Sequence, residues 1–499
     1  MDRYLNESDL IRNKLNNKIQ RNLSIIFNDW SDEKVEQITT LPSSGSYRQY
    51  FRIKGRDKTA IGVFNKDIKE NEAFFSFTKH FLKNNLNVPE IYSVSPDNKI
   101  YLIKDLGDTT LFSIVLQQQK KSGFSEDIIE LYKKTINELP KFQITAGKGI
   151  DYSRCYPRPA FDKQSMLWDL NYFKYYFLKL AKIPFDEHKL ENDFQRFTDF
   201  LLEADKNYFM YRDFQSRNIM IFKNCPYFID YQGGRNGALQ YDIASLLFQV
   251  KAAIPNDIKN YLLEYYLSNL GKYISVNSKE FKKYYWGFVY LRLLQVLGAY
   301  GFRGLYEKKS HFLQSIPTAI ENLKWLLQNI VLSVKLPTLM NVLNSLTENL
   351  PESARHGRVS KQPHSNLKIT INSFSYKKGI PDDKTENGGG FVFDCRALPN
   401  PGKSEELKHF TGKDKQVIEF LEREKEVEEF FNYVFSIIDK SVEKYLERNF
   451  TDLMVNFGCT GGQHRSVFCA EKLTNHLKEK YNVKIILTHT EEDNWKKQL

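Results

Sequence analysis

The sequence contains few cysteines and no long apolar run. Its five cysteines in 499 residues are scattered and form no CxxC pair, which argues against a disulfide scaffold and the common zinc motifs, so we expect reduced thiols. No stretch approaches the roughly 18 apolar residues of a membrane helix. The polar, acidic start Met1–Asp9 lacks the basic and apolar parts of a secretion signal. The sequence therefore predicts a cytoplasmic protein without a membrane partner.

The composition is that of a packed, basic protein. Hydrophobic residues make up 41% and aromatic residues 14% of the chain, which argues against extensive disorder. A chain of 499 residues is too long for one ordinary core, so two or three domains are expected. The formal charge of +11 favours anionic partners, but it does not choose among nucleotides, sugar phosphates and nucleic acid. No feature indicates an oligomeric state.

The first part of the chain, residues 1–104, combines one long helix with a small sheet. Apolar residues recur at helical spacing over residues 8–27, which predicts an amphipathic packing helix. A second helix is expected near Glu70–Leu82. Short alternating runs predict strands at Tyr50–Lys54, Thr59–Phe64 and Lys99–Ile103.

The rest of the chain divides at a polar linker. Residues 105–347 are dominated by helical periodicity, interrupted by a strand-and-loop island between residues 209 and 232. Residues 348–366 are rich in Pro, Ser and Gly, which is typical of a linker. Strands alternate with helices over residues 367–499, and this order predicts a compact α/β domain.

A kinase-type catalytic loop is the clearest functional motif, and Tyr211–Asn218 reads YRDFQSRN. In kinase-like folds an Asp of this loop meets the substrate hydroxyl, an Asn five residues later binds Mg²⁺, and an Asp after the next hairpin binds Mg²⁺ too. Asp213, Asn218 and Asp230 have this spacing. The intervening residues read as a β-hairpin that returns Asp230 beside Asn218. Ordinary turn residues, the alternative, would have to match this spacing by chance.

A loop near the N-terminus could cover nucleotide phosphates. Ser44, Gly45 and Ser46 lie between strand-like runs, and their backbone N–H groups could converge on an anion. A hairpin turn without function would look the same. Glu70 or Glu72 lies on the following helix, where kinases keep a carboxylate that pairs with a strand lysine.

These segments resemble the aminoglycoside phosphotransferase-like kinases, most closely the bacterial cell-wall amino-sugar kinases that phosphorylate N-acetylmuramate and N-acetylglucosamine at the anomeric hydroxyl. The resemblance covers roughly residues 35–330 and is carried by GSYRQYFRI (Gly45–Ile53), YLIKDLG (Tyr101–Gly107), YRDFQSRNIM (Tyr211–Met220) and FIDYQGGRNGALQYDIASLL (Phe228–Leu247). It implies an α+β protein-kinase-like fold with a small β-rich N-lobe (residues 1–104) and a helical C-lobe (residues 105–347), followed by the separate α/β domain.

The resemblance also implies roles for individual residues. These are Asp213 as catalytic base, Asn218 and Asp230 as Mg²⁺ ligands, Asp242 as a carboxylate supporting the loop, and the backbone at Ile103, Lys104 and Asp105 as the hinge that reads adenine. The sequence departs from the family in two places: Tyr211 replaces a common His, and Ala60–Asn65 has no lysine. The missing cation could be Arg48, Arg52 or Lys66. Asp169 could face the acceptor.

A second anion site is predicted near the end of the chain. Gly458–Ser466 lies between a strand and a helix, where glycines, a helix N-terminus and Arg465 could hold a phosphate. The spacing Cys459-x5-Arg465-Ser466 also matches the phosphate loop of cysteine phosphatases. A phosphatase therefore stands as an alternative, although no general-acid Asp can be placed.

Residues 367–489 resemble the C-terminal domain of the RNase adaptor RapZ. The matching segments are SFSYKKGIP (Ser373–Pro381), VFDCRALPNP (Val392–Pro401), FTGKD (Phe410–Asp414) and GCTGGQHRSVFCAE (Gly458–Glu471). In that family the domain senses an amino-sugar phosphate and contacts RNA. Candidate ligand contacts are Lys377, Asp394, Arg396, Cys459, Thr460, Gly461, Gly462, His464, Arg465 and Ser466, with His489 weaker. The acidic end Glu491–Asp493 argues against RNA, and the family's own N-terminal P-loop domain is absent.

Together these observations predict an ATP- and Mg²⁺-dependent kinase acting on a sugar hydroxyl, with an amino sugar or cell-wall sugar as acceptor. The C-terminal domain would bind a sugar phosphate as regulator, product or channelled intermediate. Two alternatives remain at this stage. One is a metabolite-sensing or RNA-linked adaptor whose kinase domain is a scaffold, and the other is a second enzymatic activity at Cys459.

Overall fold

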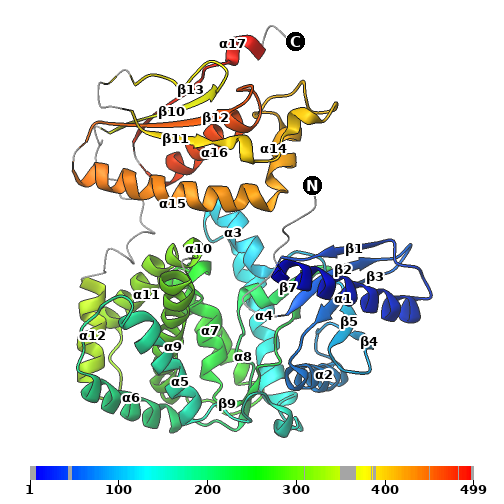
Figure 1. The fold of residues 1–499 in the computed structure, drawn as a ribbon. Coiled ribbons are helices and arrows are strands. Elements are labelled where there is room, and N and C mark those ends of the chain that lie inside the picture. Colours follow the sequence, from blue (N-terminus) through cyan, green and yellow to red (C-terminus); the bar gives the residue numbers. More distant parts are fainter. Residues whose placement is uncertain are drawn as a thin grey trace. The chain divides into compact units, whose positions relative to one another are not determined.

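The computed structural model describes residues 7–42, 48–307, 309–348, 367–383, 385, 389–448, 450–481 and 483–495. The chain forms two compact units, Met1–Gly357 and Arg358–Leu499 (Figure 1). Apart from Glu348, the predicted linker 348–366 lies outside the described residues.

A five-stranded antiparallel sheet begins the first unit, with the strand order β1-β2-β3-β5-β4. The strands are β1 Gln37–Thr40, β2 Gln49–Lys54, β3 Thr59–Phe64, β4 Ile91–Val94 and β5 Ile100–Lys104. Alternating apolar residues predicted β2, β3 and β5. The edge strands β1 and β4 were missed because they are short, and β1 reads QITT with mostly exposed side chains.

Helices α1 (Glu7–Ser31) and α2 (Ile68–Lys83) cover opposite faces of this sheet (Figure 1). Ile53 packs with Leu23 of α1, whereas Val63 points to the other face and packs with Phe77 of α2. A Cβ atom on Gly62 would lie 2.5 Å from Leu23, so glycine lets α1 lie directly on β3. The packing helix predicted at residues 8–27 is confirmed.

Helices make up most of the remainder of the first unit. They are α3 Leu111–Ser122, α4 Glu126–Pro140, α5 Lys163–Phe173, α6 Glu187–Leu202, α7 Gln240–Leu247, α8 Asn256–Leu270, α9 Ser278–Tyr300, α10 Ser310–Leu313, α11 Ile316–Asn329 and α12 Pro337–Glu348. Helix α9 contacts α5, α6, α7 and α11, and this central position explains its nearly unbroken apolar sequence. Within the described ranges, no helix combines the length and apolar character needed to cross a membrane.

Two short strand pairs interrupt the helices. β6 (Tyr208–Met210) pairs with β9 (Arg235–Gly237), and β7 (Ile219–Phe222) forms a hairpin with β8 (Cys225–Phe228). The hairpin was predicted, whereas β9 was not. A small β-rich lobe followed by a helical lobe is the predicted protein-kinase-like fold, which is confirmed.

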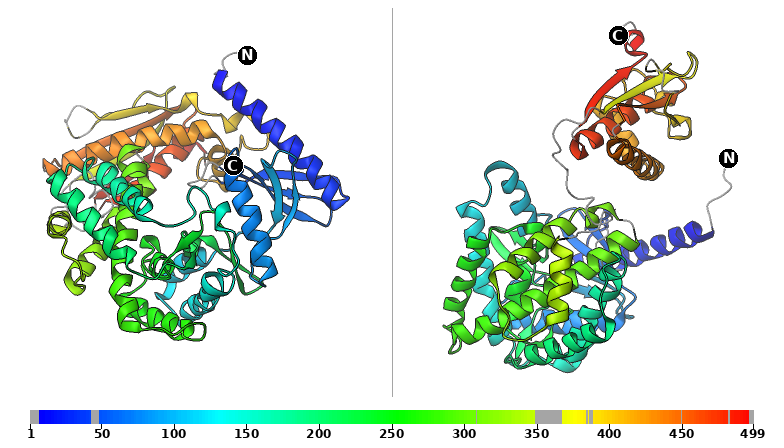
Figure 2. Two further views of the ribbon diagram at one scale, coloured as in Figure 1. Left: turned by 90° about the horizontal axis from the view of Figure 1, so that it is seen from below. Right: turned by 90° about the vertical axis from the view of Figure 1, so that its left-hand side faces the viewer.

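The second unit is built on a four-stranded parallel sheet with the order β11-β12-β10-β13 (Figure 2). Its elements are β10 Lys368–Ser375, β11 Phe391–Asp394, α14 Lys415–Glu422, α15 Lys425–Glu447, β12 Asp452–Cys459, α16 Arg465–Lys480, β13 Lys484–His489 and α17 Glu492–Trp495. The connections through α15 and α16 run in the same direction along the sheet, so right-handed crossovers place both helices on one face. There Ile371 and Val455 share a core with Phe431 and Leu473. The predicted separate α/β domain is confirmed.

Candidate active site

The loop Tyr211–Asn218 connects β6 to the β7–β8 hairpin. The hairpin returns the chain to the end of this loop, where the N–H of Ile229 donates to the carbonyl of Asn218 at 3.0 Å. The side-chain amide of Asn218 donates to the carbonyl oxygen of Asp213 (2.9 Å) and to Oδ2 of Asp230 (3.2 Å). The three residues selected by their spacing therefore lie together.

Asn218 and Asp230 offer oxygen atoms that suit Mg²⁺. Gln232 donates to Oδ1 of Asp230 at 2.7 Å, and Asn218 uses its amide nitrogen in the bonds above. Among the described residues, no cluster of three or more His, Cys, Asp and Glu side chains could hold a metal by itself. Mg²⁺ in phosphotransfer sites needs only one or two protein ligands, because phosphates and water supply the rest. This pair of oxygen donors fits a metal that enters with a nucleotide.

The carboxylate of Asp242, in the first turn of α7, holds the loop backbone. It is fully buried and accepts the N–H groups of Tyr211 and Arg212 at 2.9 Å each, and the side-chain amide of Gln143 at 3.1 Å. Burial raises its pKa to about 7, against the opposing effect of these donors. Arg212 has a φ angle of +79°, which is unfavourable for a residue with a side chain. Asp242 stabilises that strained conformation.

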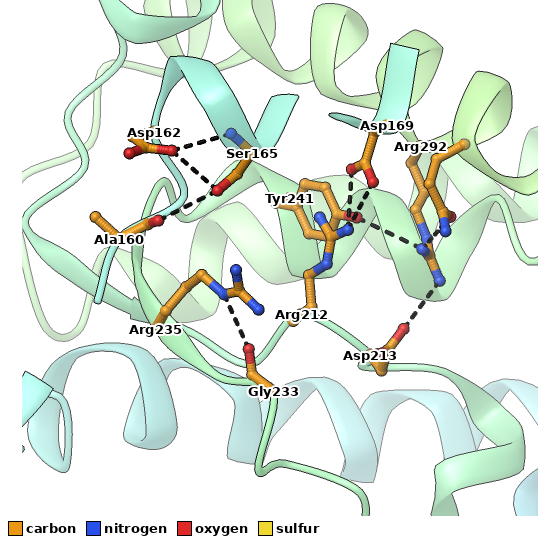
Figure 3. A network of polar contacts seen from close by, with 11 residues as sticks. Ala160, Asp162, Ser165, Asp169, Arg212, Asp213, Gly233, Arg235, Tyr241 and Arg292 are labelled. Carbon is orange, nitrogen blue, oxygen red and sulfur yellow. Dashed lines mark hydrogen bonds and ion pairs between the residues drawn. The ribbon is translucent and has the colours of Figure 1, made fainter. Parts of the chain in front are cut away.

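Arg292 of α9 supplies the charge partner of Asp213 (Figure 3). Its Nη2 lies 3.3 Å from Oδ1 of Asp213. Burial by itself would raise the pKa of the Asp213 carboxyl, but Arg292 leads a set of cations that lowers it below its usual value. The other members of that set are Arg212, Arg217 and Arg235. Asp213 is thereby held in the ionised form that a proton acceptor requires.

Arg292 was missed from the sequence although a signal existed. It is the single charged residue in the apolar run Tyr284–Val296, and a buried arginine needs a partner. That reasoning could have identified Arg292 as a site residue, but it could not have identified Asp213 as the partner.

Arg48 is a buried cation that pairs with the carboxylate of α2. Its side chain is almost completely buried, with Nη2 3.3 Å from Oε1 of Glu70 on α2 and Nη1 3.9 Å from Oδ1 of Asp230. Kinases usually pair the helix carboxylate with a lysine on the third strand. Here β2 runs antiparallel to β3 with Gln49 opposite Phe64, so Arg48 reaches the same carboxylate from the start of the neighbouring strand.

The other two cations considered from the sequence are placed elsewhere. Arg52 is bound to Asp105 (2.7 Å) and Asp108 (2.9 Å), and the side chain of Lys66 is exposed. Arg48 is therefore the one of the three that lies against the carboxylate of Asp230.

The predicted nucleotide contacts are partly described. Ser44, Gly45 and Ser46 lie outside the described residues. Ile103 and Lys104 end β5, and Lys104 donates its backbone N–H to the carbonyl of Glu90 at 2.9 Å. The carboxylate of Asp105 is bound by Arg52. The predicted hinge therefore offers a ligand the backbone groups just after β5.

Arg212, the residue before Asp213, is held by a second set of contacts (Figure 3). Arg212 donates to both carboxylate oxygens of Asp169 on α5 at 2.9 Å. Its guanidinium also lies over the rings of Phe161 (4.7 Å) and Tyr241 (5.1 Å). Asp169, expected near the acceptor, thus anchors the residue next to Asp213. Arg235 lies beside this network, and nothing in the sequence marked it.

In the second unit, the candidate anion contacts gather at the carboxyl ends of the strands. The strand register pairs Ser375 with Cys459 and Asp394 with Gly458, which brings the residues after β10, β11 and β12 to one edge of the sheet. Thr460, Gly461, Gly462 and His464 form the loop before α16, and Gly462 has a φ angle of +69°. This edge is where open parallel sheets bind ligands.

Several of the candidate side chains are already engaged with protein groups. Arg396 pairs with Asp394 at 2.6 Å, and Nη1 of Arg465 donates to the carbonyls of Arg396 (2.8 Å) and Leu398 (3.0 Å). Lys377 is exposed. Arg465 therefore ties the β11 loop to α16 through one of its terminal nitrogens.

Cys459 has polar neighbours that are unusual for a buried thiol. Its sulfur accepts the N–H of Gly462 at 3.2 Å and lies 3.1 Å from the hydroxyl of Ser466. His464 lies on the same loop, and burial lowers the pKa of its imidazole below the usual value.

Residues 367–493 match the family described as the RapZ C-terminal domain. Among curated proteins, a nucleotide-binding protein of Thermosipho melanesiensis is 33% identical over 189 residues, which is 38% of this chain and 65% of that protein. A nucleotide-binding protein of Paraburkholderia phymatum is 40% identical over 126 residues, which is 25% of this chain and 41% of that protein. The chain thus spans about half the length of the curated relatives it matches.

Solved structures of small-molecule kinases align with somewhat more than 60% of the chain. Choline kinase from Cryptosporidium parvum aligns with a TM-score of 0.41 and 13% identity, covering 62% of this chain and 93% of that one. Spectinomycin phosphotransferase in complex with ADP and spectinomycin aligns with a TM-score of 0.40 and 11% identity, covering 66% and 98%. Because both TM-scores are below 0.5, we take neither acceptor as evidence for this chain.

Proposed function

We propose that this protein is an ATP-dependent kinase that phosphorylates a hydroxyl group of a sugar. The observation that carries the proposal is the joint placement of Asp213, Asn218 and Asp230, with Arg48 paired to Glu70 beside them. Phosphoryl transfer needs positioning and charge neutralisation more than covalent chemistry, and these residues supply both. The resemblance of residues 35–330 to amino-sugar kinases supports an amino sugar or cell-wall sugar as acceptor.

In this proposal each residue has a defined task. Asp213, kept ionised by Arg292, orients the acceptor hydroxyl and takes up its proton. Arg48 neutralises phosphate charge, while Glu70 fixes its guanidinium. Asn218 and Asp230 hold Mg²⁺, which when bound supplies positive charge against the β- and γ-phosphates. The backbone after β5 binds the adenine.

The second unit is proposed to bind a sugar phosphate at the carboxyl edge of its sheet, as a regulator or as the product. Support comes from the register that gathers the β10, β11 and β12 loops and from the match of residues 367–493 to the RapZ C-terminal domain. Both units then serve amino-sugar metabolism.

An ATP-consumption screen over amino sugars, cell-wall sugars and their neutral relatives tests the proposal. We expect Mg²⁺-dependent ADP release with at least one acceptor. ATP binding without turnover on any acceptor would favour the adaptor alternative, in which the kinase unit serves as a scaffold.

A phosphatase at Cys459 is a second candidate activity, favoured by the Gly462 and Ser466 contacts to its sulfur. Arg465 argues against this activity, because its Nη1 donates to backbone carbonyls of the β11 loop, whereas a phosphatase needs this arginine to bind the phosphate. Hydrolysis of p-nitrophenyl phosphate that disappears in Cys459→Ser would establish this activity, and its absence in the wild type would remove it.

Arg48→Met is expected to raise KM for ATP about 10- to 100-fold, because a charge-assisted contact to phosphate is lost. Arg48→Lys should recover part of this loss. Lys66→Met, which removes an exposed cation near the same strands, should leave KM within about twofold. An unchanged KM in Arg48→Met would show that the phosphates are anchored by another group.

Arg292→Met is expected to move the acid limb of the kcat/KM profile to higher pH. Burial raises the pKa of Asp213 and Arg292 is the foremost cation that lowers it, so losing the cation raises the pKa. The base is active only when deprotonated, so the variant loses activity at a pH where the wild type is still fully active. Arg56→Met, at an arginine whose side chain is 80% exposed, is the control. Identical acid limbs in wild type and variant would contradict the role of Arg292.

A further inference from the structure

Arg235 is a buried arginine without an acidic partner. Its side chain is only 7% exposed, and the hydrogen bond it makes is from Nε to the carbonyl of Gly233 at 3.0 Å. Among the described residues, no Asp or Glu lies within ion-pair distance of it. Burial, assisted by the nearby Arg212, lowers the pKa of its guanidinium to about 10. Its terminal nitrogens are not among the fully enclosed side-chain nitrogens of the described residues, so this mostly buried cation keeps an open edge while it lacks a counter-charge, which destabilises the fold.

The neighbouring arginines show what Arg235 lacks (Figure 3). Arg212 has Asp169 at 2.9 Å, and Arg292 has Asp213 at 3.3 Å. These three guanidinium groups are therefore matched by two carboxylates. Asp162, also drawn in Figure 3, is bound by Arg158 and Ser165. Arg212, Arg292 and Arg235 together carry one positive charge more than Asp169 and Asp213 balance.

Backbone pairing places Arg235 beside the strand that leads to Asp213. β9 pairs with β6 so that Arg235 lies opposite Met210, three residues before Asp213. The groups that act on its charge belong to the helical lobe, and they include Asp169 of α5 and Tyr241 of α7. The nucleotide side is served by a different cation, because Arg48 contacts Asp230 and Glu70. The guanidinium of Arg235 points toward Arg212 (Figure 3).

We propose that Arg235 binds an anionic group of the acceptor, so that the preferred substrate is a sugar bearing a carboxylate or a phosphate. This inference rests on the proposed kinase function and names the substrate class of the same site. The two terminal nitrogens of a guanidinium match the two oxygens of such a group. Binding supplies the counter-charge that the protein omits, and a neutral sugar leaves Arg235 unpaired. Arg235 is thus a specificity residue.

The test compares wild type, Arg235→Met, Arg235→Lys and the surface control Arg56→Met in the full chain. Each is assayed with two matched sets: glucose, glucuronate and glucose 6-phosphate; and N-acetylglucosamine, N-acetylmuramate and N-acetylglucosamine 6-phosphate. We expect the wild type to favour one anionic member of a set over its neutral parent in kcat/KM. Arg235→Met should reduce that ratio about 30-fold or more, Arg235→Lys less, and Arg56→Met not at all. The preferred member distinguishes carboxylate from phosphate.

Two kinetic results would overturn the inference. One is a wild-type preference for the neutral sugar. The other is an equal loss in Arg235→Met with every acceptor, which would place Arg235 on the transferred phosphoryl group or in the general fold.

Thermal unfolding separates this inference from the kinase proposal. Without ligand, Arg235→Met should melt at the same temperature as wild type or about 2–4 °C higher, because an unpaired buried charge is removed. Saturating sugar acid or sugar phosphate should raise the melting temperature of the wild type and not that of Arg235→Met. If no acceptor is turned over, this ligand-induced shift in melting temperature still tests whether Arg235 binds the anion. A clearly lower melting temperature of unliganded Arg235→Met, or the same ligand shift in both proteins, would reject the binding role.

Discussion

Asp213→Asn is expected to lower kcat at least about 1,000-fold, because general-base catalysis by a positioned carboxylate contributes about 100- to 10,000-fold. Asparagine has nearly the same shape, so Asn218 can still donate to the backbone carbonyl of residue 213. It cannot take up the hydroxyl proton, and it leaves Arg292 without its carboxylate. The loss should therefore appear in kcat, whereas the dissociation constant for ATP should stay within about threefold.

The measurement is steady-state turnover with the acceptor found in the screen, together with calorimetric ATP binding. Asp57→Asn is the matched control, because Asp57 pairs with Arg56 on the surface and its side chain is 68% exposed. More than a tenth of wild-type kcat in Asp213→Asn would remove Asp213 from the chemical step. Loss of ATP binding in the same variant would mean that the substitution disturbs the site as a whole.

Asp242→Ala is expected to destabilise the first unit by about 3–5 kcal/mol, because it leaves buried donors without an acceptor. The orphaned groups are the backbone N–H groups of Tyr211 and Arg212 and the amide of Gln143. Four of the five tryptophans lie in this unit, so urea unfolding followed by tryptophan fluorescence reports on it. A loss below about 1 kcal/mol would show that the loop does not depend on this carboxylate.

The stability that Asp242 contributes also depends on pH. Its folded pKa, about 7, is raised from 3.8, so the folded state holds a proton that the unfolded state releases. That contribution to stability is fully present below the unfolded pKa and is lost as the pH rises through about 7. The stability of the wild type relative to Asp242→Asn should accordingly fall as the pH rises from 4 to 7. Thermal unfolding at both ends of that range measures it.

The kinase-like fold class came from the family resemblance, whereas the strands of the small sheet and the grouping of Asp213, Asn218 and Asp230 could be predicted from the residues themselves, because they depend on local order. Alternation of apolar residues marks β2, β3 and β5, and the spacing of Asp213, Asn218 and Asp230 is set by one loop and one hairpin. Edge strand β1 was missed because it has only one apolar residue, Ile38, to reveal it.

Residues contributed from distant segments could not be assigned in this way. Arg292 lies 79 positions after Asp213 and meets it through the packing of α9. Arg48 was one of three cations that the sequence allowed, and the choice required the pairing of β2 with β3 and the position of α2. Arg235 belongs to a three-residue strand, and no sequence pattern predicts that this strand pairs with β6.

The arginine beside Glu70 also determines which chemical reagents can detect this site. Acyl-phosphate nucleotide probes mark kinases by transferring an acyl group to the amine of a lysine near the phosphates of ATP. The guanidinium of Arg48 stays protonated at any pH a protein survives and is not a nucleophile. Under the proposed function, lysine-directed acylating nucleotides and covalent inhibitors would find no amine to attack at this position.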